Sequence, residues 1–220
     1  MNKLIPIALG AAVVIGGGAW LATSPTTSTT AISPVTPAVA QDADVEMAPD
    51  MVMGDADAPV ELIEYASFTC PHCADFHERV LDDLKTDYID TGKVKYVHRE
   101  VYFDRYGLWA GLVARCGGDA RYFGIVDMLY EGQQDWIGDG QEASILDNLK
   151  TIGKKAGLTE EEVDVCMNDE AQAQSMVAAF QANASADEVE GTPTLFINGE
   201  KYSNMTYEDL TEIIDGLIES

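Results

Sequence analysis

Two cysteines separated by two residues, where a strand pattern passes into a helix pattern, constrain this chain more than any other feature. The segment PVELIEYASF (59–68) has the apolar and aromatic composition of a strand, and it runs directly towards Cys70. Pro71 follows at a position where a first helical turn tolerates proline. From Cys73 onward, apolar residues recur at helical spacing, which predicts a helix over 73–85. Cys70 is therefore expected at a helix N-terminus, directly behind a strand.

The patterns along the rest of the chain predict two halves of a small sheet domain that flank a helical block. They indicate strands over 50–54 and 93–101, helices from 106 to 188, a strand, an Asn-Gly turn and a strand over 191–202, and a helix over 207–218. This order predicts an α/β fold. Residues 50–104 and 189–220 would form the sheet domain, and 105–188 an inserted all-helical subdomain.

Local signals subdivide the helical block. Gly117 and Gly118 are expected to separate two helices. The run TEEE that starts at Thr159 predicts a capping box, with Glu162 at the reciprocal position. The glycine-containing segment EGQQDWIGDG (131–140) is expected to be a loop.

The start of the chain predicts export from the cytoplasm. Lys3 is followed by a run without charge over 4–24, with the positive charge on the cytoplasmic side. The apolar stretch 4–22 approaches the roughly 20 residues that span a bilayer. The AVA at 38–40 has the form of a cleavage site but lies far beyond that stretch. The sequence leaves open whether 1–24 is a cleaved signal peptide or a permanent membrane anchor.

Composition separates a tether from a globular part. Residues 25–49 are rich in Ser, Thr, Pro and Ala, cannot bury a core, and are predicted to form a flexible tether. The formal net charge is −25, from 38 acidic and 13 basic residues, which argues against nucleic-acid binding because phosphates require clustered Lys and Arg. The acidity reflects either a salt-adapted, solvated surface or selection of partners by charge.

The Cys70–Cys73 pair admits three interpretations. A zinc site needs a second pair of ligands at suitable spacing, whereas Cys116 and Cys166 are isolated and the only histidines are His72, His77 and His98. A structural disulfide over so short a loop contributes little stability. A redox pair agrees best with the position, because a helix N-terminus and a protonated His72 would both stabilise a Cys70 thiolate. Neither a metal nor a cofactor is expected.

The strand, CPHC, helix, helical insertion and GTPT ahead of the closing hairpin resemble the DsbA-type thiol oxidoreductases of the thioredoxin superfamily. The resemblance covers about residues 50–220, and CPHC between a strand and a helix is a specific signal. It implies that Cys70 is the exposed nucleophile and Cys73 its buried partner. Pro71 and His72 would be the intervening dipeptide, whose histidine stabilises the thiolate.

The resemblance also implies roles for three residues outside the motif. Pro193 matches a cis-proline that packs beside the active disulfide, and with Thr192 it would hold an extended substrate. Many DsbA oxidases have Val before this proline, whereas the disulfide isomerases have Thr. Glu64 matches the acidic group beneath the active site that relays the proton of Cys73; the alternative is an exposed strand carboxylate.

The other cysteines and histidines are given structural roles. In an oxidising compartment Cys116 and Cys166 are expected to pair, closing a loop of about 50 residues and stabilising the fold by roughly 4 kcal/mol. Two separate buried thiols are the alternative. His77 is expected to pack or to face solvent, and His98 to be a hydrogen-bonded core histidine.

Together these observations predict an exported, periplasmic thiol:disulfide oxidoreductase. It would introduce disulfide bonds into reduced, unfolded or extended substrate proteins through Cys70 and Cys73. The family resemblance implies reoxidation by a DsbB-like membrane quinone reductase, and we expect a monomer. One alternative is a disulfide isomerase or reductase, although the tether offers no core for a DsbC-like dimer. A non-catalytic thioredoxin-fold chaperone is the other.

Overall fold

The computed structural model describes residues 45–220. The predicted export segment (1–24) and most of the predicted tether (25–49) lie outside the described residues. Within residues 45–220, no helix combines the length and the apolar character needed to cross a bilayer. Ala48 is buried, and its N–H donates to the carbonyl of Ser175 at 3.1 Å. The packed part of the chain therefore begins ahead of Asp50.

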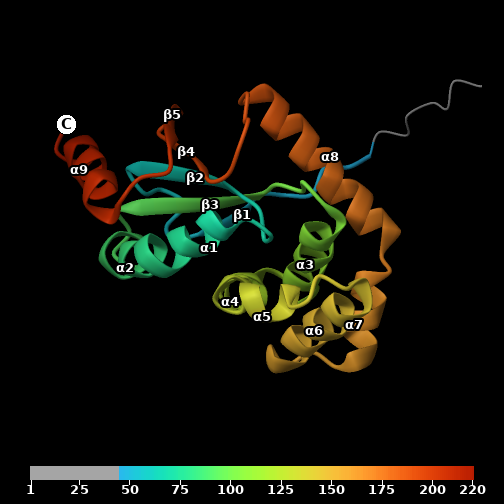
Figure 1. The fold of residues 1–220 in the computed structure, drawn as a ribbon. Helices are drawn as coiled ribbons and strands as arrows, with labels where there is room; N and C mark the ends of the chain where they lie inside the picture. Colours follow the sequence, from blue (N-terminus) through green and yellow to red (C-terminus); the bar gives the residue numbers. More distant parts are fainter. Residues whose placement is uncertain (1–44) are drawn as a thin grey trace, which may run out of the picture. The chain divides into compact units, whose positions relative to one another are not determined.

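The sheet has five strands in the order β1-β3-β2-β4-β5 (Figure 1). The strands are β1 (Met51–Met53), β2 (Val60–Ala66), β3 (Val94–Glu100), β4 (Thr194–Ile197) and β5 (Glu200–Ser203). β2 and β3 are parallel, whereas the other neighbours are antiparallel. A parallel pair requires a crossover, and the helix that starts beside Cys70 forms it. The predicted α/β fold is confirmed, with its halves brought together at the β2–β4 pair.

The helix after Cys70 is longer than the sequence predicted. It starts at Pro71, the residue expected in its first turn, and runs to Ile89, beyond the predicted end at residue 85. It consists of α1 (Pro71–Phe76), the π-helical turn η1 (His77–Leu81), α2 (Asp82–Leu84) and a second π-helical turn, η2 (Lys85–Ile89). Its buried side chains, such as Leu84 and Ile89, continue the apolar face beyond residue 85.

The inserted helices form a group beside the sheet, and α8 leads back from that group to β4 (Figure 1). The remaining helices are α3 (Arg105–Cys116), α4 (Asp119–Glu131), α5 (Gln133–Ile137), α6 (Glu142–Lys155), α7 (Glu160–Met167), α8 (Glu170–Ala186) and α9 (Tyr207–Ile218). The break at Gly117–Gly118 and the capping box of Thr159 with Glu162 are confirmed. The prediction of a loop over 131–140 is wrong, because α5 lies within it.

Two hydrophobic clusters meet at α1. One contains the cores of α3, α4 and α6 together with Phe68 and Cys73. The other contains β2, β3, β4 and α9 together with Phe76. Residues three apart on a helix lie on neighbouring positions of its surface, so α1 presents Cys73 to the insertion and Phe76 to the sheet. The Cys70–Cys73 pair therefore lies where the two parts of the fold join.

Candidate active site

Cys70 occupies the position immediately before the first turn of α1. Its backbone is extended, with φ −87° and ψ 118°, and Pro71 is the first helical residue. The Cys70 carbonyl already accepts the first helical hydrogen bonds, from the N–H groups of Cys73 at 3.1 Å and Ala74 at 3.2 Å. The sulfur is half-buried and lies at the positive end of a helix that continues to Ile89.

The surroundings of Cys70 lower the pKa of its thiol to about 5. The largest cause is a hydrogen bond from the thiol of Cys73; burial opposes it. The Thr192 side chain and the backbone N–H groups of Cys73 and His72 lower the pKa further. All of these donors favour the charged sulfur. The sequence analysis predicted that the His72 imidazole stabilises the Cys70 thiolate. In the structure, the contribution of His72 to the low pKa of Cys70 comes from its backbone N–H.

Cys73 is in the opposite environment. Its side chain is 0% exposed. Burial raises the pKa of its thiol, and the hydrogen bond with Cys70 and the charge of Glu64 raise it further. Both cysteines are free in this structure. The lowered pKa favours a thiolate at Cys70, and the raised pKa favours a thiol at Cys73. The two sulfurs thus differ in exposure and in charge.

Glu64 lies on β2 and is 0% exposed, so it is not an exposed strand carboxylate. Its Oε2 atom is 3.1 Å from His77 Nε2, and it also accepts a hydrogen bond from the hydroxyl of Tyr96. Sequence reasoning missed His77 as a partner of Glu64. The available signal was spacing, because His77 follows Cys73 by four residues and lies one turn further along the same side of the helix.

Glu64, His77 and His98 each bring one possible ligand atom within 4.8 Å of the others. Hydrogen bonds already engage most of these atoms. His98 lies with Nδ1 2.7 Å from the hydroxyl of Tyr122 and Nε2 3.4 Å from that of Tyr130. We therefore interpret the cluster as a buried hydrogen-bond network, which agrees with the structural role expected for His98.

Thr192 and Pro193 lie beside Cys70. The peptide bond between them is cis. The Cys70 thiol, when protonated, donates to the Thr192 carbonyl at 3.4 Å. Residues Glu190–Thr194 and Lys201–Ser203 line an open groove of about 610 Å³ along this segment. The structure therefore brings both predicted substrate-binding residues to the Cys70 sulfur, next to a groove.

The fold and this sulfur pair can now be compared with known proteins. The sequence profile of the Thioredoxin family matches residues 46–216. The chain belongs to the thioredoxin family. The matched residues include CPHC, Glu64 and the Thr192–Pro193 segment, and they extend through the helical insertion.

Several relatives place the chain among DsbA-type proteins. The crystal structure of Wolbachia pipientis alpha-DsbA1 is 27% identical, with a TM-score of 0.72 over 80% of this chain and 94% of that chain. BdbD from Bacillus subtilis shares the fold, with 23% identity and a TM-score of 0.69 over 80% and 98%. A Rickettsia bellii protein named "Putative protein-disulfide oxidoreductase" is 34% identical over 77% of this chain. The match spans 65% of that protein's length. The predicted DsbA-type resemblance and thioredoxin-like fold are confirmed.

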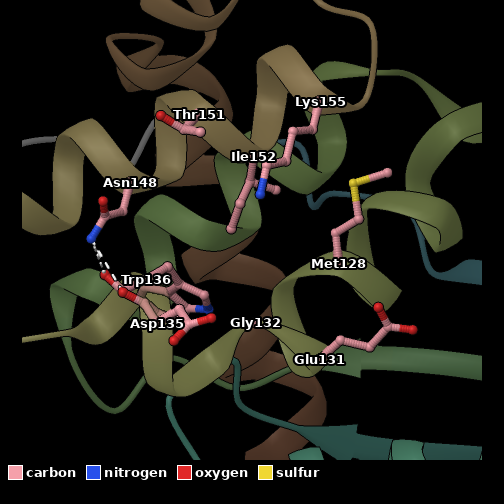
Figure 2. Close-up of a pocket in the computed structure, with 9 residues that line it drawn as sticks. All are labelled: Met128, Glu131, Gly132, Asp135, Trp136, Asn148, Thr151, Ile152 and Lys155. Atoms are coloured by element: carbon pink, nitrogen blue, oxygen red, sulfur yellow. Dashed lines mark hydrogen bonds between the residues drawn. The ribbon is translucent and has the colours of Figure 1, made fainter.

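In this thioredoxin-family chain, the insertion also supports the active-site loop. Gln133, at the start of α5, donates from Nε2 to the carbonyls of Phe68 at 2.9 Å and Cys70 at 3.0 Å. Asn148 of α6 donates to the carbonyls of Asp135 and Trp136, which holds the other end of α5 (Figure 2). Sequence reasoning missed Gln133, because its segment had the composition of a loop.

Figure 2 shows the pocket at this junction, about 430 Å³ between α4, α5 and α6. Its wall combines Trp136 with Glu131 and Lys155, and it contains neither a cysteine nor a histidine. We therefore regard it as part of the support of α5 and not as a reaction centre.

A second contact joins the loop to the start of the insertion. Asp104 accepts hydrogen bonds from the backbone N–H groups of Tyr106 and Gly107 and so caps α3. Its other oxygen accepts from the hydroxyl of Thr69 at 2.7 Å. The residue before Cys70 is therefore fastened to the helix cap of α3.

Cys116 and Cys166 form a disulfide, with their Cα atoms 5.6 Å apart. The bond joins the end of α3 to α7 across a separation of 50 residues. The alternative of two separate buried thiols does not hold in this structure. The bond lies wholly within the insertion.

Proposed function

We propose that this chain is a thiol:disulfide oxidoreductase that passes its Cys70–Cys73 disulfide to reduced proteins. The observation that carries the proposal is the contrast between the two sulfurs: the pKa of Cys70 is lowered to about 5, and that of buried Cys73 is raised. An environment that stabilises the Cys70 thiolate stabilises the reduced enzyme. Its disulfide is then a strong oxidant.

The proposed reaction starts from the oxidised pair. A substrate thiolate attacks the Cys70 sulfur, a bond forms between these two sulfurs, and the Cys70–Cys73 bond breaks with its electron pair going to Cys73. Cys73 takes up a proton, because its buried site disfavours a thiolate. A second substrate thiolate then attacks the substrate sulfur of the mixed disulfide. The substrate gains a disulfide, and Cys70 leaves as a stable thiolate.

The groove beside Thr192 and Pro193 is the proposed substrate site. It is open along Glu190–Thr194 and adjoins the Cys70 sulfur. An extended chain laid along such a segment can use backbone hydrogen bonds, which depend little on its side chains. The substrate class that suits this site is an unfolded or extended segment that carries reduced cysteines.

We further propose that the chain acts as an exported, periplasmic monomer. The run without charge after Lys3 supports export, either with cleavage or with residues 4–22 retained as a membrane tether. Reoxidation needs an acceptor for two electrons, and the family resemblance favours a DsbB-like membrane quinone reductase. This acceptor would restore the Cys70–Cys73 disulfide after each reaction, so that one protein molecule could oxidise many substrates.

Oxidative refolding of a reduced model protein tests the proposed function. The oxidised chain should form disulfides in that protein and become reduced at Cys70 and Cys73. Cys70→Ser should abolish the reaction, and Cys73→Ser, whose Cys70 has first been converted to a mixed disulfide with glutathione, should exchange it for a mixed disulfide with the substrate and release reduced glutathione. A Cys70→Ser variant as active as the unmodified chain contradicts the proposal.

Disulfide isomerisation is the second candidate, because Thr192 stands where the isomerases have threonine. Its test is the recovery of a protein whose disulfides have been wrongly paired. An oxidase restores little activity to the wrongly paired protein. An isomerase restores that activity, because its reduced cysteine pair repeatedly exchanges disulfides with the protein. Reduction of insulin by the same samples separates a reductase from both. If none of these activities depends on Cys70, a non-catalytic chaperone becomes the better explanation.

A further inference from the structure

The chemistry proposed above requires a proton to reach a sulfur that water does not reach. Cys73 gains a proton each time the disulfide opens and loses it each time the disulfide closes. Its side chain is 0% exposed. Glu64, whose charge acts on Cys73, is also 0% exposed, so a relay that ends at Glu64 does not reach solvent. Another group has to connect Glu64 to the surface.

His77 has the contacts for this connection. Its Nε2 atom lies 3.1 Å from Glu64 Oε2. Its Nδ1 atom is buried and has no hydrogen-bond partner among residues 45–220. The ring packs against that of Tyr130, with the centroids 4.0 Å apart and the planes tilted by 32°, which restricts its orientation. Nε2 is thus hydrogen-bonded to the buried Glu64 carboxylate, while Nδ1 has no hydrogen bond to any of the described residues.

The same histidine lines a pocket of about 350 Å³, and Glu64 is not among the residues that line it. Carboxylates dominate the wall of this pocket: Glu78, Asp82, Asp127 and Glu131. Glu78, Asp82 and Asp127 are exposed, so the pocket is in contact with solvent. Carboxylates that exchange protons with water can supply and accept a proton at the mouth of a path.

We propose that His77 conducts the proton of Cys73 between Glu64 and this acidic pocket, an inference that rests on the proposed function. When the disulfide opens, Nε2–H of His77 gives its proton to the Glu64 carboxylate, the carboxyl group passes it to the Cys73 sulfur, and Nδ1 takes a proton from the pocket. When the disulfide closes, each transfer runs backwards. One proton enters and one leaves in each cycle, so the imidazole returns to its starting form without rotating.

His98 lies close by but cannot serve the same purpose. Both of its nitrogens lie against tyrosine hydroxyls, and neither is bonded to Glu64. Burial holds the pKa of His98 well below its usual range, so its imidazole stays neutral. His98 is therefore a control for the loss of a buried imidazole from the same network.

Single-turnover oxidation of the reduced chain by oxidised glutathione separates the relay from the proposed function. The first step, attack by the Cys70 thiolate, depends on glutathione concentration and does not involve the proton of Cys73. The second step, closure of the mixed disulfide by Cys73, is independent of that concentration and requires this proton to leave. Rapid quenching by alkylation, followed by mass spectrometry, measures both steps. If the first step fails, the proposed function fails, whereas the relay concerns only the second.

His77→Gln should slow closure at least tenfold, because an amide can donate to Glu64 but cannot pass a proton on, and acid–base groups typically contribute 10²–10⁴. The rate of the first step should not change. His77→Ala should be equally slow, and added imidazole, which fits the enlarged pocket, should restore much of its closure rate. His98→Gln and the unmodified chain should gain nothing from imidazole.

Two results would overturn the relay: an unchanged closure rate in His77→Gln, or slow His77 variants whose closure imidazole does not accelerate. The second result would mean that His77 only supports the packing. If both His77 variants melt at a much lower temperature, the variant Glu78→Gln/Asp82→Asn/Asp127→Asn/Glu131→Gln decides the question, since it removes every carboxylate of the pocket and alters only exposed side chains. Closure should then slow several-fold while the first step is unchanged, and unaltered closure refutes the relay.

Discussion

At the scale of single residues, the two sulfurs of one motif differ because their surroundings differ. Cys70 receives hydrogen bonds from Cys73, Thr192 and the start of the helix, whereas Cys73 lies in the core of the insertion beside Glu64. Donors that point at a sulfur favour its charge, and burial opposes it. The negative charge of the pair is therefore favoured at Cys70, the more exposed of the two sulfurs.

The Cys70 thiol should titrate far below the usual value. Its pKa in the folded chain is about 5, against about 8.5 in an unfolded one. Because the folded value is the lower one, the thiolate's contribution to the stability of the reduced form is complete above about pH 8.5 and is lost as the pH falls through about 5. Ultraviolet absorbance of the thiolate, with Cys70→Ser as the blank, measures the midpoint. A midpoint at or above about 8.5 contradicts the oxidant hypothesis.

Thr192→Val should shift the reduction potential of the Cys70–Cys73 pair by tens of millivolts, where about 30 mV corresponds to 1.4 kcal/mol. The substitution removes the hydroxyl that contributes to the pKa of Cys70 and keeps the size of the side chain. Potential and pKa should move in opposite directions, since a more stable thiolate makes a stronger oxidant. Equilibration with glutathione measures the potential, and Thr211→Val on α9 is the control. An unchanged potential would leave Thr192 with a role only in the turn.

At the scale of elements, the short helix α5 positions one side chain, Gln133, which donates hydrogen bonds to the backbone around Cys70. Its five residues lie between Gly132 and Gly138, so composition alone favours a loop. Burial of Trp136 and the hydrogen bond from its Nε1 atom to the Leu129 carbonyl hold the helix in place. Gln133 is thereby fixed against the backbone of the active-site loop.

Gln133→Met should lower the free energy of unfolding by about 1–3 kcal/mol, because the buried Phe68 carbonyl loses its donor while the size of the side chain is kept. Gln134→Met, on the exposed neighbour, should have almost no effect. Chemical denaturation of both variants measures the difference. Equal stabilities would show that α5 does not support the loop.

At the scale of the whole molecule, the redox pair joins two separately packed parts. The sheet cluster is closed by α1 and α9, and the insertion cluster is closed by its own helices. The Cys116–Cys166 bond lies within the insertion and far along the chain from the redox pair. It should therefore stabilise the fold without taking part in disulfide exchange.

Replacement of Cys116 and Cys166 by alanine should lower the free energy of unfolding by about 4 kcal/mol, the chain-entropy value for a loop of this length. In the unmodified chain, mild reduction that opens Cys70–Cys73 should leave both of these cysteines unlabelled by alkylation. Denaturation and peptide mass spectrometry measure the two results. Labelling of both cysteines under native conditions would remove the assignment of an inert structural bond.

The sequence alone determined the order of the five strands and of the two parts of the sheet domain around a helical block, the strand–CPHC–helix junction and the capping box at Thr159. These features depend on periodicity, capping and turn residues, which act over a few neighbours along the chain. The position of Cys70 at a helix start follows from such neighbours, and so does the part of its low pKa that comes from backbone N–H groups.

Only the tertiary structure decided which side chains meet. The strand pattern of β2 did not reveal the face on which Glu64 lies, because both faces of a central strand are covered. Its pairing with His77 depends on how the helix packs on the sheet, and the contact between Gln133 and the Phe68 carbonyl spans 65 residues of sequence. Contacts of this kind are set by the packing of whole elements, which no local pattern encodes.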